Sequence, residues 1–187
     1  MAANTHASAE DRAEMRRLAQ LYHLEGYLFG TVWPRFVAQG TLSAYDFYAI
    51  VIWKSIRSKK RIRAGLAAAG KSAGDLMQEV RAAGTPEAKV ETLLAVQGFG
   101  LPMASAVLSV CYPDRFTVLG YRSWRGLAEM APDALPARYP ATAAEYVRYC
   151  VACADLAKRL GLLLRDLDRA LWAKSWELDL RALVDER

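Results

Sequence analysis

The chain has 187 residues, of which 53% are hydrophobic and 24% are charged. This length and composition exclude an intrinsically disordered chain and predict a folded domain with a substantial core. The formal net charge of +5 mildly favours a polyanionic partner such as nucleic acid.

The beginning of the chain lacks an apolar stretch behind a basic start, so we expect no secretory signal. The longest nearly uncharged run, residues 96–112, contains glycines and a proline and is too short to cross a bilayer. We therefore expect a cytoplasmic protein that makes no membrane contact, and that would be nucleoid-associated if it binds DNA.

The three cysteines predict neither a disulfide framework nor a metal site. Their number is odd, and Cys150 and Cys153 lie three residues apart in a helical pattern, on one apolar face. A zinc or iron–sulfur site needs about four ligands, and the chain has only two histidines. We interpret the cysteines as buried core thiols and expect no metal and no cofactor.

Apolar residues recur at three- and four-residue steps along most of the chain, which predicts helices. Trp33-Pro34 is expected to break the first helix, and Ser43 and Thr85 are expected N-caps. The chain shows no convincing strand pair. The predicted fold class is therefore all-α, one compact multi-helix domain over residues 1–187, with helices at 9–29, 43–58, 60–69, 72–83, 86–97, 101–111, 121–130, 142–160 and 164–174.

A short turn, Gly98-Phe99-Gly100, joins the predicted helices 86–97 and 101–111. Glycines allow positive φ and a close approach of a phosphate, and the free N–H groups at the start of the second helix favour an anion. Ala104, four residues after Gly100, lets the two helices pack closely. The pattern over about 86–111 resembles the helix-hairpin-helix motif, which binds the DNA backbone.

The segment that follows extends the likeness. The loop 112–119 and the apolar pattern up to Trp124 have the length and form seen in the helix-hairpin-helix DNA glycosylase superfamily, typified by endonuclease III, and the chain resembles that superfamily. Two further segments, Trp53-Lys54-Ser55 with Arg57 and 167–172, look like parts of small glycosylase-like bacterial proteins. The resemblance implies a DNA-glycosylase-like fold, non-sequence-specific contacts to the backbone of double-stranded DNA, and a monovalent cation at the hairpin. The cysteine cluster that holds iron–sulfur in some relatives is absent.

The chain departs from that superfamily at two catalytic positions. Gly120 stands where the resemblance places an acid that stabilises positive charge on the sugar, and Pro102 stands where some members carry a lysine nucleophile. Loss of the carboxylate removes electrostatic stabilisation worth several kcal/mol. Asp114 is the nearest alternative acid, although Pro113-Asp114 is also a good turn pair. Asp46 and Glu25 are weaker candidates, so the catalytic residue stays open.

Six basic side chains lie between Lys54 and Arg63. They could be a solvated helix end or could contact phosphates. The candidate DNA-binding residues are Gly98, Phe99, Gly100, Pro102, Lys54, Arg57 and Lys59. Candidates for a base pocket are Tyr121, Arg122, Trp124 and Trp53, for which core packing is the alternative. Trp172 and Trp176, four residues apart, are expected in the core.

Three functional hypotheses stay open. The first is a DNA-binding protein of glycosylase-like fold that recognises damaged or distorted DNA without classical catalysis. The second is an active monofunctional DNA glycosylase with a non-canonical acid. The third is a helical interaction or regulatory scaffold that does not bind DNA. Fold analogy does not decide among them, and the sequence does not indicate an oligomeric state.

Overall fold

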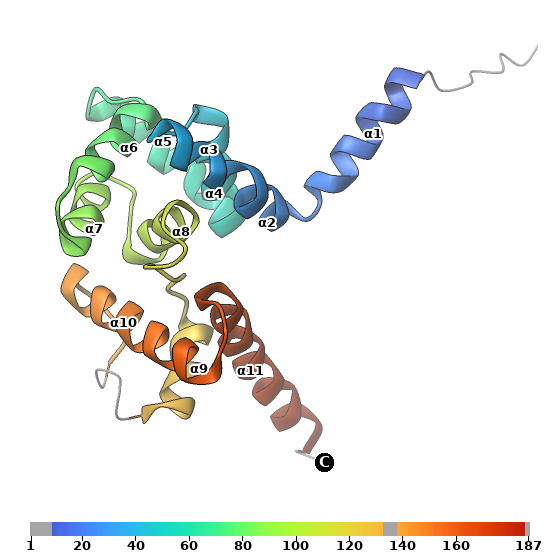
Figure 1. The fold of residues 1–187 in the computed structure, drawn as a ribbon, viewed down its shortest axis with the longest axis vertical. Helices are drawn as coiled ribbons and strands as arrows, with labels where there is room; N and C mark the ends of the chain where they lie inside the picture. The colour runs from blue at the N-terminus through green and yellow to red at the C-terminus, as the bar shows by residue number, and fades with distance from the viewer. Residues whose placement is uncertain (1–8, 133–137, 186–187) are drawn as a thin grey trace, which may run out of the picture.

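The computed structural model describes residues 9–132 and 138–185, and within these ranges the chain forms helices and no strands, which confirms the all-α prediction. Figure 1 shows their arrangement, with α1 projecting from the body. The helices are α1 (Ala9–Leu21), α2 (Leu24–Tyr27), the π-helix η1 (Leu28–Val32), α3 (Trp33–Gln39), α4 (Ala44–Ser55), the 3-10 helix η2 (Ile56–Ser58), α5 (Lys59–Ala68), α6 (Ala73–Ala82), α7 (Pro86–Leu94), α8 (Leu101–Cys111), α9 (Tyr121–Met130), α10 (Ala143–Leu160) and α11 (Leu164–Asp185).

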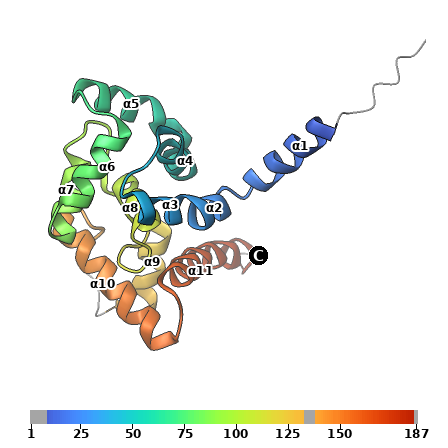
Figure 2. The same ribbon diagram turned by 45° about the horizontal axis from the view of Figure 1, so that its top comes forward.

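Helix α8 forms the centre of the core. All of its residues except Pro102 are buried, because the sequence from Leu101 to Cys111 contains no charged side chain. It packs against α3, α4 and α7. Helices α9, α10 and α11 lie on the other side, where α9 and α11 pack against each other, as Figures 1 and 2 show. Helix α8 therefore lies between the N-terminal helices and the group formed by α9, α10 and α11.

Side-chain caps fix where several helices begin. The hydroxyls of Ser43 and Thr85 accept hydrogen bonds from the backbone three residues later, at 3.1 Å in both cases, as the sequence predicts. Ser72 and Thr142 form capping boxes with Asp75 and with Glu145. Because a cap satisfies N–H groups that have no partner inside the helix, these residues define the starts of α4, α6, α7 and α10.

The predicted break at Trp33-Pro34 is wrong. Helix α1 ends at Leu21 instead, and helical structure then runs from Leu24 through the π-helix and α3 to Gln39. Pro34 is tolerated because it occupies the first turn of α3, where a missing N–H has no helical partner to lose. The helical segment ends at Gly40, the C-cap of α3, which has a φ of +71°.

The last helix is longer than predicted, since α11 reaches Asp185 rather than residue 174. The expectation that Trp172 and Trp176 lie in the core is also wrong. They are 50% and 46% exposed and stack on each other, with ring centroids 6.5 Å apart. The buried stripe of this helix consists of Leu164, Leu167, Asp168, Leu171 and Ser175.

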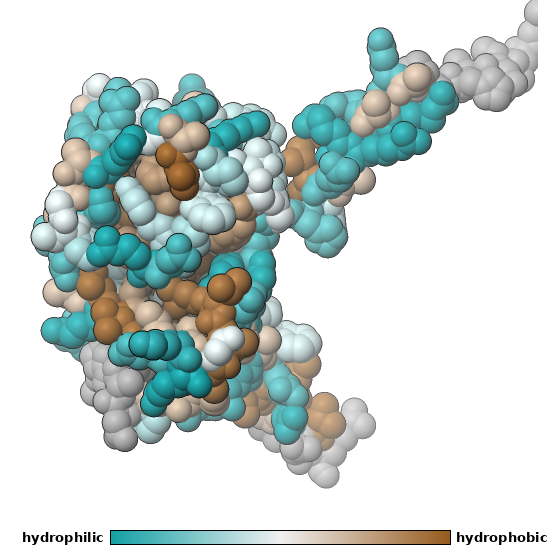
Figure 3. All heavy atoms as spheres, viewed as in Figure 1, coloured by the Kyte–Doolittle hydropathy of each residue, from teal (hydrophilic) through white to brown (hydrophobic). Residues whose placement is uncertain are grey.

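Helix α1 stands away from the other helices in Figures 1 and 2, and its visible surface is mostly hydrophilic in Figure 3. The same view shows hydrophobic surface at mid-height on the body of the molecule. None of the helices within the described ranges has the length and apolar character needed to cross a bilayer.

Candidate functional site

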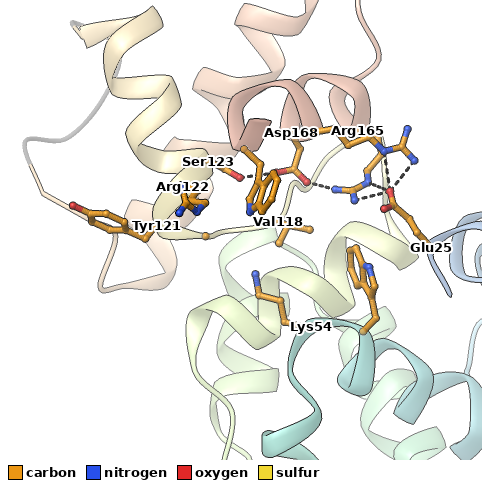
Figure 4. A pocket seen from close by; sticks show the side chains of 12 residues that line it. Glu25, Lys54, Val118, Tyr121, Arg122, Ser123, Arg165 and Asp168 are labelled. Atoms are coloured by element: carbon orange, nitrogen blue, oxygen red, sulfur yellow. Dashed lines mark hydrogen bonds and ion pairs between the residues drawn. The ribbon is translucent and has the colours of Figure 1, made fainter. Parts of the chain in front are cut away.

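A cavity of about 440 Å³ lies where the end of α4 meets the starts of α9 and α11, and Figure 4 shows its lining side chains. Most of them are charged or aromatic. They are Glu25, Trp53, Lys54, Val118, Gly120, Tyr121, Arg122, Ser123, Arg165, Asp168, Arg169 and Trp172.

Lys54 enters the cavity from the last turn of α4. Its Nζ donates a hydrogen bond to the carbonyl of Leu119 at 3.0 Å. Burial lowers the pKa of Lys54 to about 8, even though the negative charge of Asp168 favours the protonated amine. Among the described residues no carboxylate lies within ion-pair distance of this amine.

Asp168 enters the cavity from α11 and is only 5% exposed. Its carboxylate accepts a hydrogen bond from the hydroxyl of Ser123 at 3.0 Å and forms an ion pair with Arg165. Burial raises the pKa of Asp168, while Arg165 and Ser123 act in the opposite direction. The cavity thus holds a buried carboxylate with hydrogen bonds to both oxygens.

Arg165 links the start of α11 to the N-terminal helices. Its guanidinium donates two hydrogen bonds to Glu25, at 2.8 and 2.6 Å. The same group lies 5.1 Å from the ring centre of Phe29 and 5.2 Å from that of Trp53. Burial alone would raise the pKa of Glu25, but Arg165 and Arg169 outweigh it and hold the pKa below its usual value.

The backbone of Leu119 connects the cavity to α8. Its N–H donates to the hydroxyl of Ser105 on α8 at 2.8 Å, and its carbonyl accepts from Lys54. Gly120 comes next and is the N-cap of α9. A Cβ at Gly120 would lie 3.9 Å from Nζ of Lys54 and 4.0 Å from Oγ of Ser123, in ordinary contact with both. The position therefore has room for a side chain, and that side chain would face the lysine amine.

The turn before α8 packs directly on the basic helix α5. Gly98 has a φ of +101°, and a Cβ there would lie 3.0 Å from the backbone of Arg61. A Cβ on Gly65 of α5 would lie 1.8 Å from the carbonyl oxygen of Gln97. Gly100 differs, because it is exposed and a Cβ there would meet only Pro102, at 3.9 Å.

No family model, curated protein or solved structure matches the chain. The function is therefore argued from the geometry of the site.

The candidate DNA-binding residues do not all lie on the outer surface. Gly100, Pro102, Arg57 and Lys59 are exposed, and Gly98 is partly buried in the turn. Phe99 packs against Phe47, with ring centroids 6.3 Å apart. Lys54 lies in the cavity rather than beside Arg57 and Lys59 on the surface.

Three of the four candidate pocket residues line the cavity, namely Trp53, Arg122 and Tyr121. Tyr121 is 66% exposed and points away from Asp168 in Figure 4. Trp124 does not line the cavity and packs edge-on against Tyr139 at 5.9 Å.

The alternative acids lie elsewhere, except for Glu25. Asp114 is exposed and borders a different hollow, with Pro86 and Phe116. Asp46 is buried and accepts hydrogen bonds from Tyr27 and Arg35. Neither carboxylate lines the cavity beside Gly120.

Sequence reasoning did not single out Asp168 and Arg165 as site residues. A signal was present, because Asp168 falls on the helical stripe formed by Leu164, Leu167 and Leu171, where an unpaired carboxylate would be costly. An acid in an apolar stripe indicates a buried partner or a function. Arg165 gives no comparable signal, since its ring contacts come from residues far away in the chain.

Within the described ranges no group of three or more His, Cys, Asp or Glu side chains could hold a metal ion. The three cysteines are free and buried, as predicted. The carbonyls of Val96 and Gly100, at the turn where the resemblance places a monovalent cation, already accept backbone hydrogen bonds. A monovalent cation at this turn stays a prediction.

Proposed function

We propose that the chain binds double-stranded DNA through non-sequence-specific backbone contacts and recognises damaged or distorted duplex by receiving an extruded nucleotide in the cavity. On this proposal α7, the turn and α8 act as a helix-hairpin-helix motif in a glycosylase-like fold, and the protein associates with the nucleoid. One observation carries the proposal. The backbone N–H of Leu119 donates to Ser105 on α8, and the carbonyl of Leu119 accepts a hydrogen bond from Lys54 in the cavity, so this residue connects α8 to the cavity.

The backbone contact would form at the turn and α5. At the start of α8 the N–H groups of Gly100 and Leu101 are the ones that could meet a phosphate, because Pro102 has no N–H and the N–H of Met103 already donates to the Gly100 carbonyl at 2.9 Å. Helix α5 packs on the same turn and brings Lys59, Lys60 and Arg63, whose side chains are exposed. Cations beside a helix N-terminus favour a phosphate without reading the base sequence.

Helix α8 connects the two parts of the proposed interface. Gly100 is its N-cap, and Ser105, which accepts the hydrogen bond from the Leu119 N–H, follows about 8 Å along a helix that rises about 1.5 Å per residue.

The cavity has the size and lining that a nucleotide needs. Ligand sites in proteins are commonly about 300–1,000 Å³, a range that includes this cavity. Trp53 and Trp172 line the cavity, and their rings already contact other groups: Arg165 lies 5.2 Å from the ring centre of Trp53, and Arg122 lies 5.9 Å from that of Trp172, which also stacks on Trp176. A base outside the duplex would stack on these rings in place of an arginine.

A second candidate, an active glycosylase with a non-canonical acid, is favoured by Asp168. Its carboxylate lies in the cavity and is bonded to Ser123, three residues after the position where the resemblance expects the acid. A carboxylate there could stabilise positive charge on a sugar. Release of a damaged base by the wild-type protein but not by Asp168→Asn would support this candidate, whereas no release by either would leave only the binding function.

Fluorescence anisotropy tests the binding proposal with an intact duplex and with one containing a tetrahydrofuran abasic analogue, each at several salt concentrations. We expect tighter binding to the analogue and a steep fall in affinity with salt. Lys59→Ala should lower the log–log salt slope by about 0.9 if it removes one phosphate contact. The same change at Lys158, on α10 and away from α5 in Figures 1 and 2, should not change the slope.

Gly100→Leu would cover the start of α8, and we expect it to weaken binding at least tenfold while the protein stays folded. Gly84→Leu is the matched control, because Gly84 also has open space around its Cα and lies at the other end of α7. Equal affinity of Gly100→Leu, Gly84→Leu and the wild type would overturn the docking mode. Absence of any salt-dependent binding would favour the interaction-scaffold hypothesis.

A further inference from the structure

Helix α1 receives little support from the rest of the fold. Every side chain of α1 that the structure describes is exposed, apart from Leu21, and the main contact of the helix is with α2 at its own end. A helix of 13 residues is marginal in water by itself, because most helical stability in proteins comes from packing of an apolar face. The exposed apolar residues Met15, Leu18 and Tyr22 are three and four positions apart and therefore share one face. This face requires a surface to pack on.

Helix α11 carries an apolar stripe that stays exposed within the described residues. The α11 stripe consists of Trp172, Trp176, Leu180 and Leu183, which are between 41% and 70% exposed. It lies on a different face of the helix from the residues that pack in the core. A contiguous apolar surface of this kind marks an interaction site. Its length is about 17 Å, close to the length of α1, which is about 20 Å on a rise of about 1.5 Å per residue.

The apolar face of α1 and the α11 stripe match each other in an antiparallel arrangement. When Leu18 lies against Trp176, the remaining apolar residues of α1 fall opposite those of the stripe, because both sets advance by about one helical turn per step. The pairs are Tyr22 with Trp172, Leu18 with Trp176, and Met15 with Leu180. Three apolar contacts therefore form in a single register.

The charges beside the two surfaces are complementary in the same register. Arg16 and Glu177 each come one residue after an apolar residue of their surface, and matching flanks meet in an antiparallel helix pair. Glu14 lies on the opposite flank, where two arginines of α9 donate to Asp179 of α11. The present partners of Glu14 and Glu177 are arginines of their own helices, in exposed ion pairs that are worth little and exchange at little cost.

We propose that α1 is an arm exchanged between two copies of this chain, so that the Met15, Leu18 and Tyr22 face of each copy packs antiparallel on the α11 stripe of the other. A two-fold axis makes both contacts at once with the same residues. The inference stands apart from the proposed DNA binding, but it affects the same cavity. Because Trp172 lines that cavity, Tyr22 of the second copy would border it.

The direction of α1 points to a second copy rather than to the chain's own α11. The two helices leave the body in different directions in Figures 1 and 2. The short connection to α2 is hydrogen-bonded on both sides, with the N–H of Tyr22 donating to the carbonyl of Ala19 and the carbonyl of His23 accepting from the next turn. Glu25 of α2 is bonded in turn to Arg165 at the start of α11. These contacts hold α1 away from the stripe of its own chain.

The molar mass of the full chain, measured by light scattering after size-exclusion chromatography, tests the proposal. We expect the wild type to approach the mass of two chains as its concentration rises. Leu18→Glu and Leu180→Glu should each raise the dimer dissociation constant about tenfold or more, because each places a carboxylate in an apolar contact twice per dimer. Both leucines are 41% exposed, so neither change should lower the Tm. Leu160→Glu, at an exposed position of α10, is the matched control and should leave the dimer unchanged.

Charge reversal distinguishes exchange between copies from closure within one chain. Arg16→Glu and Glu177→Arg should each weaken the dimer, because like charges then meet at both contacts. An equal mixture of these two variants should form a heterodimer of restored affinity, since the arm of each variant meets an opposite charge on α11 of the other. Closure of α1 on its own α11 would give no such rescue.

Three results would overturn the arm exchange. The first is a wild type that stays monomeric at the highest concentration, and the second is a dimer that Leu18→Glu leaves intact, which would place the contact on another surface. The third is a wild-type dimer with no rescue in the mixture of Arg16→Glu and Glu177→Arg. DNA binding by a protein that stays monomeric would leave the proposed function in place without the exchange.

Discussion

Gly65 and Gln97 are in such close contact that a Cβ on Gly65 would lie 1.8 Å from the Gln97 carbonyl oxygen. Gly65 lies in the middle of α5, where glycine is ordinarily unfavourable. Its presence there is explained by the turn that precedes α8, which packs on this point of the helix. The contact holds the basic helix and the turn in a fixed relation, which the proposed backbone contact requires.

Gly65→Ala should therefore destabilise the fold although alanine is the better helix former. We expect a loss of about 2–3 kcal/mol and a fall in Tm of about 5–10 °C, because backbone must move to accommodate the Cβ. Circular dichroism melting measures this change. Gly26→Ala is the matched control, since Gly26 lies in a helix with open space around it and the change there should be neutral or stabilising. A Tm of Gly65→Ala equal to that of the wild type would contradict the packing of α5 on the turn.

Burial of Lys54 should make the effect of Lys54→Met on stability depend on pH. The pKa of Lys54 is about 8 in the fold, against about 10.5 for an ordinary lysine. The fold therefore bears no charge-burial cost above about pH 10.5 and bears the full cost below about pH 8. We expect the stability of Lys54→Met relative to the wild type to improve by about 1–3 kcal/mol between pH 10.5 and pH 7.

Urea unfolding at the two pH values measures this difference. Lys59→Met is the control, because the Lys59 side chain is exposed and its replacement should give the same stability change at both pH values. A relative stability of Lys54→Met that does not vary with pH would show that the amine is not held in the cavity.

The three thiols should be unreactive in the folded protein. Burial raises the pKa of Cys150 to about 11 and also raises the pKa values of Cys111 and Cys153. We expect Ellman's reagent to detect no fast thiol in native buffer and three thiols per chain in guanidinium. Rapid reaction of one thiol in native buffer would contradict the packing of α8 or α10.

The sequence predicts the helical fold well because periodic apolar residues and caps are local signals. Ser43, Ser72 and Thr85 mark helix starts wherever the rest of the chain lies. The break expected at Trp33-Pro34 did not occur, because Pro34 falls in the first turn of α3, directly after the π-helix, where a proline is tolerated.

The candidate site was predictable only in part. The sequence identified Gly120, Trp53 and Arg122 by position in a pattern, but it placed Lys54 among the surface cations. That side chain enters the cavity because the Leu119 carbonyl, 65 residues later in the chain, accepts its hydrogen bond. Long-range contacts of this kind depend on how helices dock, which helical periodicity does not specify.

The ion pair between Arg165 and Glu25 has a consequence for how the protein is made. These residues are 140 positions apart, and the cavity also needs Asp168 and Trp172 from the same late helix. On the ribosome, the turn and the basic helix are synthesised long before the cavity can close. A nascent chain stalled before Leu164 would therefore carry the turn and the basic helix without a closed cavity, which forms only as the last helix is released.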